Sequence, residues 1–122
     1  MVETKIYTLL SANATINRLI NTRVYPIVMP QDGVLPSLTY QRTAGNKVNH
    51  LGGYSGLENP HITINAWASN YDTAKNLSKH VHRIMDKSTG FTNTLFNEID
   101  AFDPEVGLFA VSQDFSCWDQ AT

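Results

Sequence analysis

The sequence predicts an α+β fold, with helices packed on one face of a mostly antiparallel sheet of about four strands. Three observations lead to this class. A strand-like alternation near the middle of the chain is followed directly by a helical pattern, and the last part has the form of a hairpin. Elements that each have one apolar face bury those faces against one another. The 122 residues are also enough for one core, so we expect a single domain over residues 1–122.

Two short helices are predicted at the N-terminus. Apolar residues at helical spacing place the first from about Glu3 to Ser11. Asn13 can cap the second, Ala14–Ile20, because its side chain can accept hydrogen bonds from the free N–H groups of a first helical turn. After these helices, Pro26 and Pro30 lack backbone donors and restrict the residues before them, so we expect extended connecting chain.

A strand and a long arm are predicted next. The strand is Ser37–Thr43, in which apolar and polar residues alternate. The arm, residues 44–60, is rich in glycine and asparagine, which predicts either a long permissive loop or a hairpin whose tip is poorly ordered alone. A loop of this length in a small domain usually has a function or is disordered. The apolar residues that this glycine-rich arm offers to a partner are Leu51, Tyr54 and Leu57.

The central strand and helix organise the rest of the chain. In His61–Ser69, apolar residues alternate with polar ones, which predicts a half-buried strand with Trp67 on its polar side. Ser69 with Asp72 has the form of a capping box, and Asn70 is a rival cap. The apolar stripe of the following helix is Tyr71, Ala74, Leu77, Val81, Ile84 and Met85. The strand and the helix are expected to bury these faces against each other.

The C-terminal part predicts a hairpin of two strands, Leu95–Phe102 and Leu108–Trp118. Residues 103–107 between them have turn chemistry, with Asp and Pro at the first positions and Gly at the last. In the final strand, one face carries Phe109, Val111, Gln113, Phe115 and Cys117. Cys117 is the only cysteine of the chain, which excludes an internal disulfide.

Composition and charge argue for a protein with protein partners. Hydrophobic residues make up 42% of the chain and charged residues only 16%, which suggests that part of the surface is covered by other subunits. The formal net charge of -2 argues against a dedicated nucleic-acid binder. All nine Lys and Arg residues lie at or before Lys87, whereas Glu98–Asp119 carries acidic charges and no basic one. The N-terminus has no apolar core of signal-peptide type and no run approaches 18 apolar residues, so the protein is expected in the cytoplasm where it is made, unless a larger particle carries it elsewhere.

No set of residues predicts catalysis, a metal or a cofactor. His80 and His82 are two apart on a helix and point in different directions, so they do not chelate jointly. A small metal-dependent hydrolase that uses His50 and His61 with acidic partners remains an alternative of a different class. Another is a DNA-binding module built on the basic helical stripe of Lys75, Lys79 and Arg83.

A set of short motifs follows in a fixed order along almost the whole chain. These motifs are Ile6–Ala12 (IYTLLSA), Arg23–Pro26 (RVYP), Leu35–Gln41 (LPSLTYQ), Ile62–Ala68 (ITINAWA), Tyr71-Asp72 before Ala74, Asp103–Leu108 (DPEVGL) and Gln113–Phe115 (QDF). As a set rather than singly, they resemble the tail-completion, or tail-terminator, family of long-tailed bacteriophages and related gene-transfer particles.

The resemblance implies a structural virion protein with no catalytic residues. A subunit of this family is expected to form a homo-oligomer, a hexameric ring that caps the tail tube protein and ends its polymerisation. The ring faces the head–tail connector or head-closure protein, and DNA passes through its lumen without sequence-specific binding. A head-closure or neck connector protein is the nearest alternative. No membrane contact is implied, and the protein is expected in the tail or neck of the virion.

Two sets of residues are assigned to this expected ring. The interface set consists of Leu51, Tyr54, Leu57 and Trp67, because the arm is implied to become ordered on assembly and Trp67 is unexplained on a polar strand face. The lumen set consists of Glu98, Asp100 and Asp114. Acidic side chains would keep DNA from adhering to the channel, because like charges repel.

Overall fold

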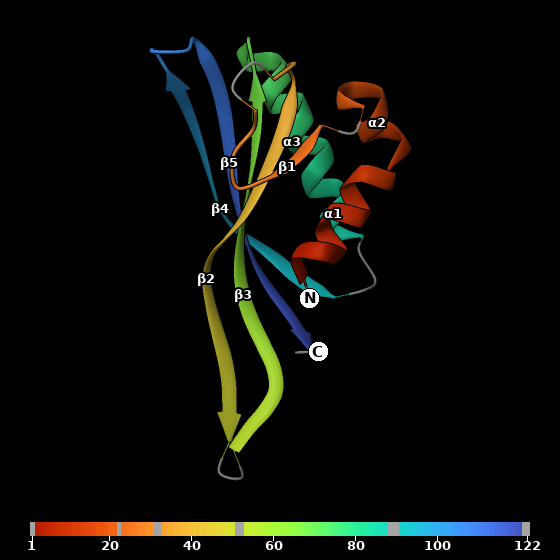
Figure 1. The fold of residues 1–122 in the computed structure, drawn as a ribbon, viewed down its shortest axis with the longest axis vertical. Helices are drawn as coiled ribbons and strands as arrows, with labels where there is room; N and C mark the ends of the chain where they lie inside the picture. Colours follow the sequence, from red (N-terminus) through yellow and green to blue (C-terminus); the bar gives the residue numbers. More distant parts are fainter. Residues whose placement is uncertain (1, 22, 31–32, 51–52, 88–90, 121–122) are drawn as a thin grey trace.

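The computed structural model describes residues 2–21, 23–30, 33–50, 53–87 and 91–120, and only the backbone of residues 44–50, 53–58 and 119–120 (Figure 1). It contains a five-stranded mixed sheet in the order β1-β2-β3-β5-β4. The strands are β1 (Val24–Pro26), β2 (Ser37–His50), β3 (Gly53–Ala68), β4 (Thr92–Asp103) and β5 (Leu108–Gln120). The β1–β2 pair is parallel, and the other three neighbouring pairs are antiparallel.

The expected number of about four strands is corrected by β1. The sequence pattern predicted connecting chain at Val24–Pro26, but these residues pair with Leu38–Tyr40 of β2. Pro26 is tolerated there because β1 is a short edge strand, and the next backbone donor, the Ile27 N–H, still bonds to the Tyr40 carbonyl of β2. A strand of three residues is too short to show a period of two.

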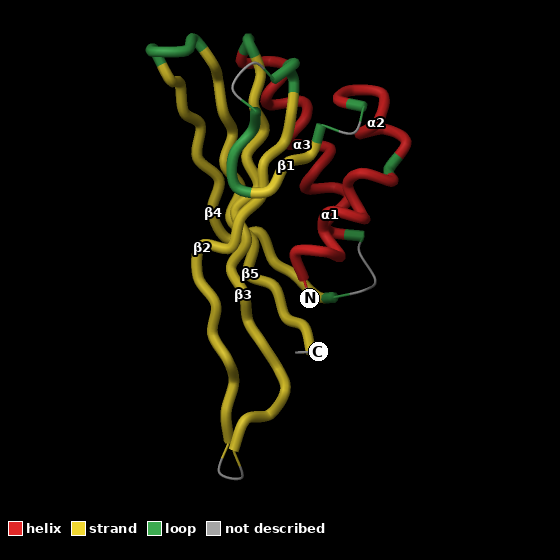
Figure 2. The backbone as a smooth tube through the Cα atoms, in the orientation of Figure 1, coloured by secondary structure: helices red, strands yellow, loops and turns green. Residues whose placement is uncertain are grey.

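The three helices lie together on one side of the sheet (Figures 1 and 2). They are α1 (Val2–Ala12), α2 (Ala14–Ile20) and α3 (Tyr71–Asp86). Asn13 caps α2 as predicted, because its Oδ1 accepts from the backbone N–H groups of Thr15 at 2.9 Å and Ile16 at 3.1 Å. Asn70 rather than Ser69 caps α3, and its Oδ1 accepts from the Thr73 N–H at 2.8 Å.

The core lies between α3, α1, α2 and the inner face of the sheet. The predicted inward residues of β3 are all buried, namely Ile62, Ile64, Ala66 and Ala68. The buried residues of the α3 stripe are Ala74, Leu77, Val81 and Met85. Tyr71 departs from the prediction, because it is 40% exposed at the first helical position and its hydroxyl contacts strand β4. Phe115 of β5 completes this core and is fully buried.

Strands β2 and β3 form one long hairpin that extends below the rest of the molecule (Figure 2). Their pairing runs from Ser37 opposite Trp67 to His50 opposite Gly53, with register shifts between Arg42 and Ala44 and between Val48 and Asn49. Strand β5 pairs with β3 only as far as Leu57. In the described part of the arm, the segment from Gly53 to Gly56 therefore has β2 as its one neighbouring strand.

The C-terminal hairpin has the predicted turn. Asp103 accepts two backbone hydrogen bonds, from the Glu105 N–H to its Oδ1 at 3.0 Å and from the Gly107 N–H to its carbonyl at 2.8 Å. Gly107 has a φ of 67°, a left-handed conformation in which glycine has no Cβ to clash. The turn thereby fixes β4 against β5, with Asp103 opposite Leu108.

Candidate assembly surfaces

The two outer edges of the sheet are surfaces to which another chain can bind. Strand β4 forms one edge along its whole length. On the other side, β1 covers β2 only at Leu38–Tyr40, and the Ile27 N–H donates to the Tyr40 carbonyl at 2.8 Å. From Gln41 to His50, no strand of the described residues pairs with the outer edge of β2. Open strand edges are templates for pairing with another chain.

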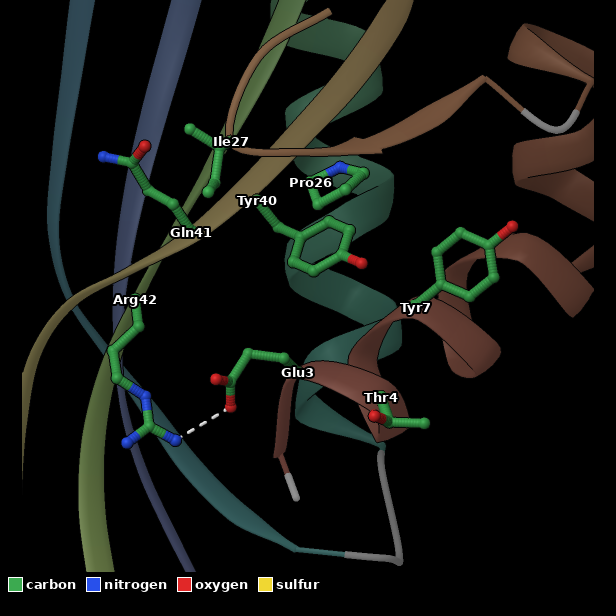
Figure 3. Close-up of a pocket in the computed structure, with 8 residues that line it drawn as sticks. All are labelled: Glu3, Thr4, Tyr7, Pro26, Ile27, Tyr40, Gln41 and Arg42. Atoms are coloured by element: carbon green, nitrogen blue, oxygen red, sulfur yellow. Dashed lines mark hydrogen bonds and ion pairs between the residues drawn. The ribbon is translucent and has the colours of Figure 1, made fainter.

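An open groove of about 570 Å³ lies beside the start of this free β2 edge, between α1 and β2 (Figure 3). Its wall is aromatic, with the rings of Tyr7 and Tyr40 6.3 Å apart between centroids. Arg42 Nη2 and Glu3 Oε1 are 2.9 Å apart across one end of the groove. Burial raises the pKa of the Tyr40 phenol, and the neighbouring Tyr7 and Glu3 act in the same direction. The groove therefore presents neutral aromatic surface with one compensated ion pair.

Strand β4 carries three large apolar side chains that face solvent. Phe96 is 54% exposed, Ile99 is 53% exposed and Phe102 is 51% exposed. A bulge between Leu95 and Asn97 interrupts the pairing with β5, so that Leu95 packs on the core while the Phe96 ring contacts His61 at a centroid distance of 5.1 Å. Bulges redirect side chains in this way.

The predicted lumen residues are divided between the two faces of the sheet. Glu98 and Asp100 lie on the helix side, where Lys75 Nζ is 3.5 Å from Glu98 Oε2 and donates to Asp100 Oδ1 at 3.0 Å. Asp114 lies on the other face, where its carboxylate accepts hydrogen bonds from Thr63 and Asn97. The structure therefore brings Glu98 and Asp100 together and leaves Asp114 apart from them.

The pair of Asp100 and Lys75 is coupled to Tyr71. The Tyr71 hydroxyl donates to Asp100 Oδ2 at 2.6 Å, and this bond is the main cause of the lowered pKa of Asp100, followed by the bond from Lys75. The same contacts with Asp100 raise the pKa of Tyr71 and of Lys75. Tyr71 and Asp100 are exposed and Lys75 is half-buried, so this cluster ties α3 to β4 at the surface. In the predicted basic stripe, Lys75 is thus engaged with acidic partners, and Lys79 and Arg83 are exposed.

The predicted interface residues do not form one cluster in the described part of the chain. Leu51 lies outside the described residues, and only the backbone of Tyr54 and Leu57 is described, in the arm portion of β3. Trp67 lies at the opposite end of β3, where it pairs with Ser37. Its indole Nε1 donates to Thr39 Oγ1 at 3.0 Å, and the ring lines a surface hollow of about 490 Å³.

The face of the sheet opposite the helices is crossed by polar side chains that bind one another. Asn65 donates to Thr39 Oγ1 at 3.3 Å and accepts a hydrogen bond from Ser112. Asn59 donates to Ser116 Oγ at 3.0 Å and to the Cys117 carbonyl at 2.7 Å. These contacts join β2, β3 and β5 across their strands.

The described histidine side chains are divided between β3 and α3. Within the described ranges, no three His, Cys, Asp or Glu side chains are close enough to hold a metal ion. His61 lies on β3 beside Phe96, whereas His82 lies on α3 with its ring 6.4 Å from that of Phe115. His50 contributes only backbone to the described structure. Of the helices that are described, none is long and apolar enough to span a membrane.

Comparison with known proteins identifies a family and a structural neighbour. A family described as tail completion protein gp17 matches residues 4–119. Among solved structures, 19 chains match. One of them comes from a structure titled "Virion of native gene transfer agent (GTA) particle" and has 16% sequence identity and a TM-score of 0.73, over 95% of this chain and 92% of that chain. At this identity the likeness establishes the fold alone. No curated protein matches the sequence.

Proposed function

Because this chain belongs to the tail completion protein gp17 family, we propose that it forms a hexameric ring that caps the tail tube and ends its growth. Membership of the family makes it a structural component of a bacteriophage tail in the virion, and not a member of an enzyme family. In the proposed role, one side of the ring binds the last ring of tube protein. The other side binds the head–tail connector or head-closure protein.

The observation that carries this proposal is the β2–β3 arm. Beyond Leu57 the described arm is a ribbon of two strands that projects from the molecule. A two-stranded ribbon is marginally stable alone in water, because too little apolar surface is buried to offset its conformational entropy. A neighbouring copy or the tail tube is therefore proposed to cover the arm.

The passage of DNA is proposed from the charge of the C-terminal strands. Glu98–Asp119 contains acidic residues and no basic ones, and like charge keeps DNA from binding to a channel wall. Asp114 and the pair of Glu98 and Asp100 lie on opposite faces of the sheet, so only one of these two groups can face a lumen lined by a sheet face. A reconstruction of the ring with both groups on its outer wall would rule out this part of the proposal.

The proposal is tested by shortening the arm without disturbing the register of the sheet. Asn46 pairs with Asn59, so residues 47–58 can be replaced by Asn-Gly, which forms a tight hairpin turn. We expect the shortened protein to fold, because the pairing of β2 with β3 from Ser37 opposite Trp67 to Asn46 opposite Asn59 is kept. It should fail to cap tail tubes, which is measured by tube length in electron micrographs when tube protein polymerises in its presence.

The full-length protein is the positive control in this experiment, and Thr15→Lys, on the exposed side of α2, is a control for an unrelated surface change. Tubes of unlimited length with the full-length protein would refute the terminator function. Normal capping by the shortened protein would show that the arm is dispensable. A melting temperature that is much lower for the shortened protein would show that the arm belongs to the core.

A further inference from the structure

We propose that strand β4 of one copy pairs, edge to edge, with the free outer edge of β2, residues 41–50, of the next copy. This inference rests on the ring proposed above and names the surfaces that join its subunits. It depends on the two sheet edges, on their charges and on the direction of the strands.

The β4 edge lacks several features that normally prevent pairing with another chain, although a bulge follows Leu95. Protected edge strands carry charged side chains, lysine above all, or proline, contain bulges, or are very short. Thr92–Asp103 contains no lysine, arginine or proline, and spans 12 residues. Its side chains at Phe96, Ile99 and Phe102 are about half exposed on the two faces of the strand. A strand laid beside β4 would pair its backbone groups and reduce the exposure of these side chains on both faces.

The matching edge on β2 is open along most of its described length, although the strand carries Lys47 and two register shifts. The strand has 14 residues, and β1 pairs with only three of them, Leu38–Tyr40. The groove between α1 and β2 begins where β1 ends, and is lined by Tyr7, Pro26, Ile27 and Tyr40. Phe102 is exposed on the helix side of β4. When β4 of the next copy lies beside β2, the Phe102 ring can pack on the aromatic surface of this groove.

The charges of the two edges are complementary. Strand β4 carries Glu98, Asp100 and Asp103 and no basic residue, and Lys75 of α3 pairs with the first two. Strand β2 carries Arg42 and Lys47 and no acidic residue, and Arg42 pairs with Glu3 of α1. Each strand would repel a second copy of itself, because like charges would be brought together, whereas β4 beside β2 brings opposite charges together. Charge therefore favours a head-to-tail contact over a symmetric contact between two β4 strands or two β2 strands.

The direction of the strands makes this contact compatible with a closed ring. Within one copy, β4 is antiparallel to β5, β5 to β3 and β3 to β2, so β4 is antiparallel to β2. Rotation about a ring axis that runs along the strands preserves their direction. Strand β4 of one copy therefore meets β2 of the next as an antiparallel neighbour, and repetition of a head-to-tail contact generates a ring when the rotation closes.

The position of β1 restricts the register of this contact. Through the sheet, Asp100 is level with Leu38, because Asp100 pairs with Val111, Val111 with Ala66 and Ala66 with Leu38. In a neighbouring copy, β1 already occupies the edge of β2 at that level. The incoming β4 must therefore be displaced toward the tip of the arm. Closed sheets contain such a stagger, because their strands are tilted against the barrel axis.

Cysteine cross-linking of the assembled protein tests this contact. Ile99→Cys on β4 is combined with a cysteine at each position from 41 to 49 of β2, one position in each variant. The native Cys117 is retained because it is fully buried. The oligomer, formed alone or on purified tail tubes, is oxidised and run on a non-reducing gel. We expect one β2 position, or two positions that are two residues apart and so share a face, to give a ladder of covalent oligomers that ends at the size of the ring.

The controls separate this inference from the ring itself. Thr15→Cys on the exposed side of α2, in place of Ile99→Cys, should give no ladder with any β2 cysteine. Dimers from Ile99→Cys alone would show symmetric β4 pairing and overturn the inference. An oligomer without β4–β2 cross-links at any of the positions would overturn it too, while the ring proposal stands. A folded chain that does not self-associate with or without tubes would overturn both.

Discussion

Strand β3 passes through two regions that differ in how they are held. Between Ile62 and Ala68 it has β2 and β5 as neighbours and α3 packed on one face, and its inward residues are fully buried. Between Gly53 and Gly56 it has only β2 beside it in the described structure. One continuous strand therefore supplies both the core of the subunit and the part that we assign to assembly. Changes in the first region should lower stability, and changes in the second region or at the free edges should lower assembly.

The largest effect on stability is expected from the core. Leu77 of α3 is 1% exposed and lies in the main apolar cluster. Leu77→Ala should lower the free energy of unfolding by roughly 2–5 kcal/mol, because it removes apolar contacts and leaves a cavity. The measurement is urea unfolding followed by circular dichroism. A neutral result would contradict the packing of α3 on the sheet.

A smaller effect is expected at the cap of α2. Asn13→Ala removes the Oδ1 acceptor of the Thr15 and Ile16 N–H groups and should cost about 1 kcal/mol. Asn13→Asp keeps an acceptor and should restore stability within about 0.5 kcal/mol. The same urea titration measures both variants. If the alanine and aspartate variants unfold alike, the cap does not hold α2 in place.

A change at the β4 edge should affect assembly strongly and stability only slightly. Ile99→Lys introduces a charge on a side chain that is 53% exposed, so the free energy of unfolding should change by less than about 0.5 kcal/mol. Assembly should be lost, because the lysine would be desolvated in the proposed β4–β2 contact. Thr15→Lys adds the same charge on α2 and should assemble normally. Light scattering reports the oligomer, and normal assembly of Ile99→Lys would contradict the proposed contact.

The smallest effect is expected from the surface cluster of Asp100, Tyr71 and Lys75. The Tyr71 hydrogen bond, and then that of Lys75, lowers the pKa of Asp100 below its ordinary value of 3.8. Stability from a carboxylate with a lowered folded pKa is present above the unfolded pKa and is lost as the pH falls through the folded value. The difference in unfolding free energy between the parent and Asp100→Asn should therefore shrink between pH 5 and strongly acidic pH. A difference that grows on acidification would contradict this sign.

Much of the subunit body could be predicted because its patterns are local. The alternation of Ile62 to Ala68 predicts the strand, the acceptor of Asn13 predicts the start of α2, and residues 103–107 predict the turn. The family resemblance was also correct, since the gp17 family matches most of the chain. These features are set by residues close together in the sequence, so they can be predicted without knowing which strands pair.

The remaining features depend on pairing that a single segment does not reveal. Strand β1 is too short for a periodic pattern and exists because β2 lies beside it. The separation of Asp114 from Glu98 follows from the register of β4 on β5, in which Glu98 pairs with Gln113. The bulge after Leu95 exposes Phe96, and no local residue pattern predicts it. The open edges of β2 and β4 become visible only once the strand order is known.

Hydrogen exchange on the free subunit and on the assembled oligomer tests most directly whether β3 serves the core in one region and assembly in the other. The account predicts that the amides of Ile62–Ala68 exchange slowly in both states. The amides of residues 45–50 and 53–56, together with the outer amides of β4, should exchange fast in the free subunit and at least tenfold more slowly after assembly. Equal protection of the arm in both states, or protection of the body only after assembly, would contradict the account.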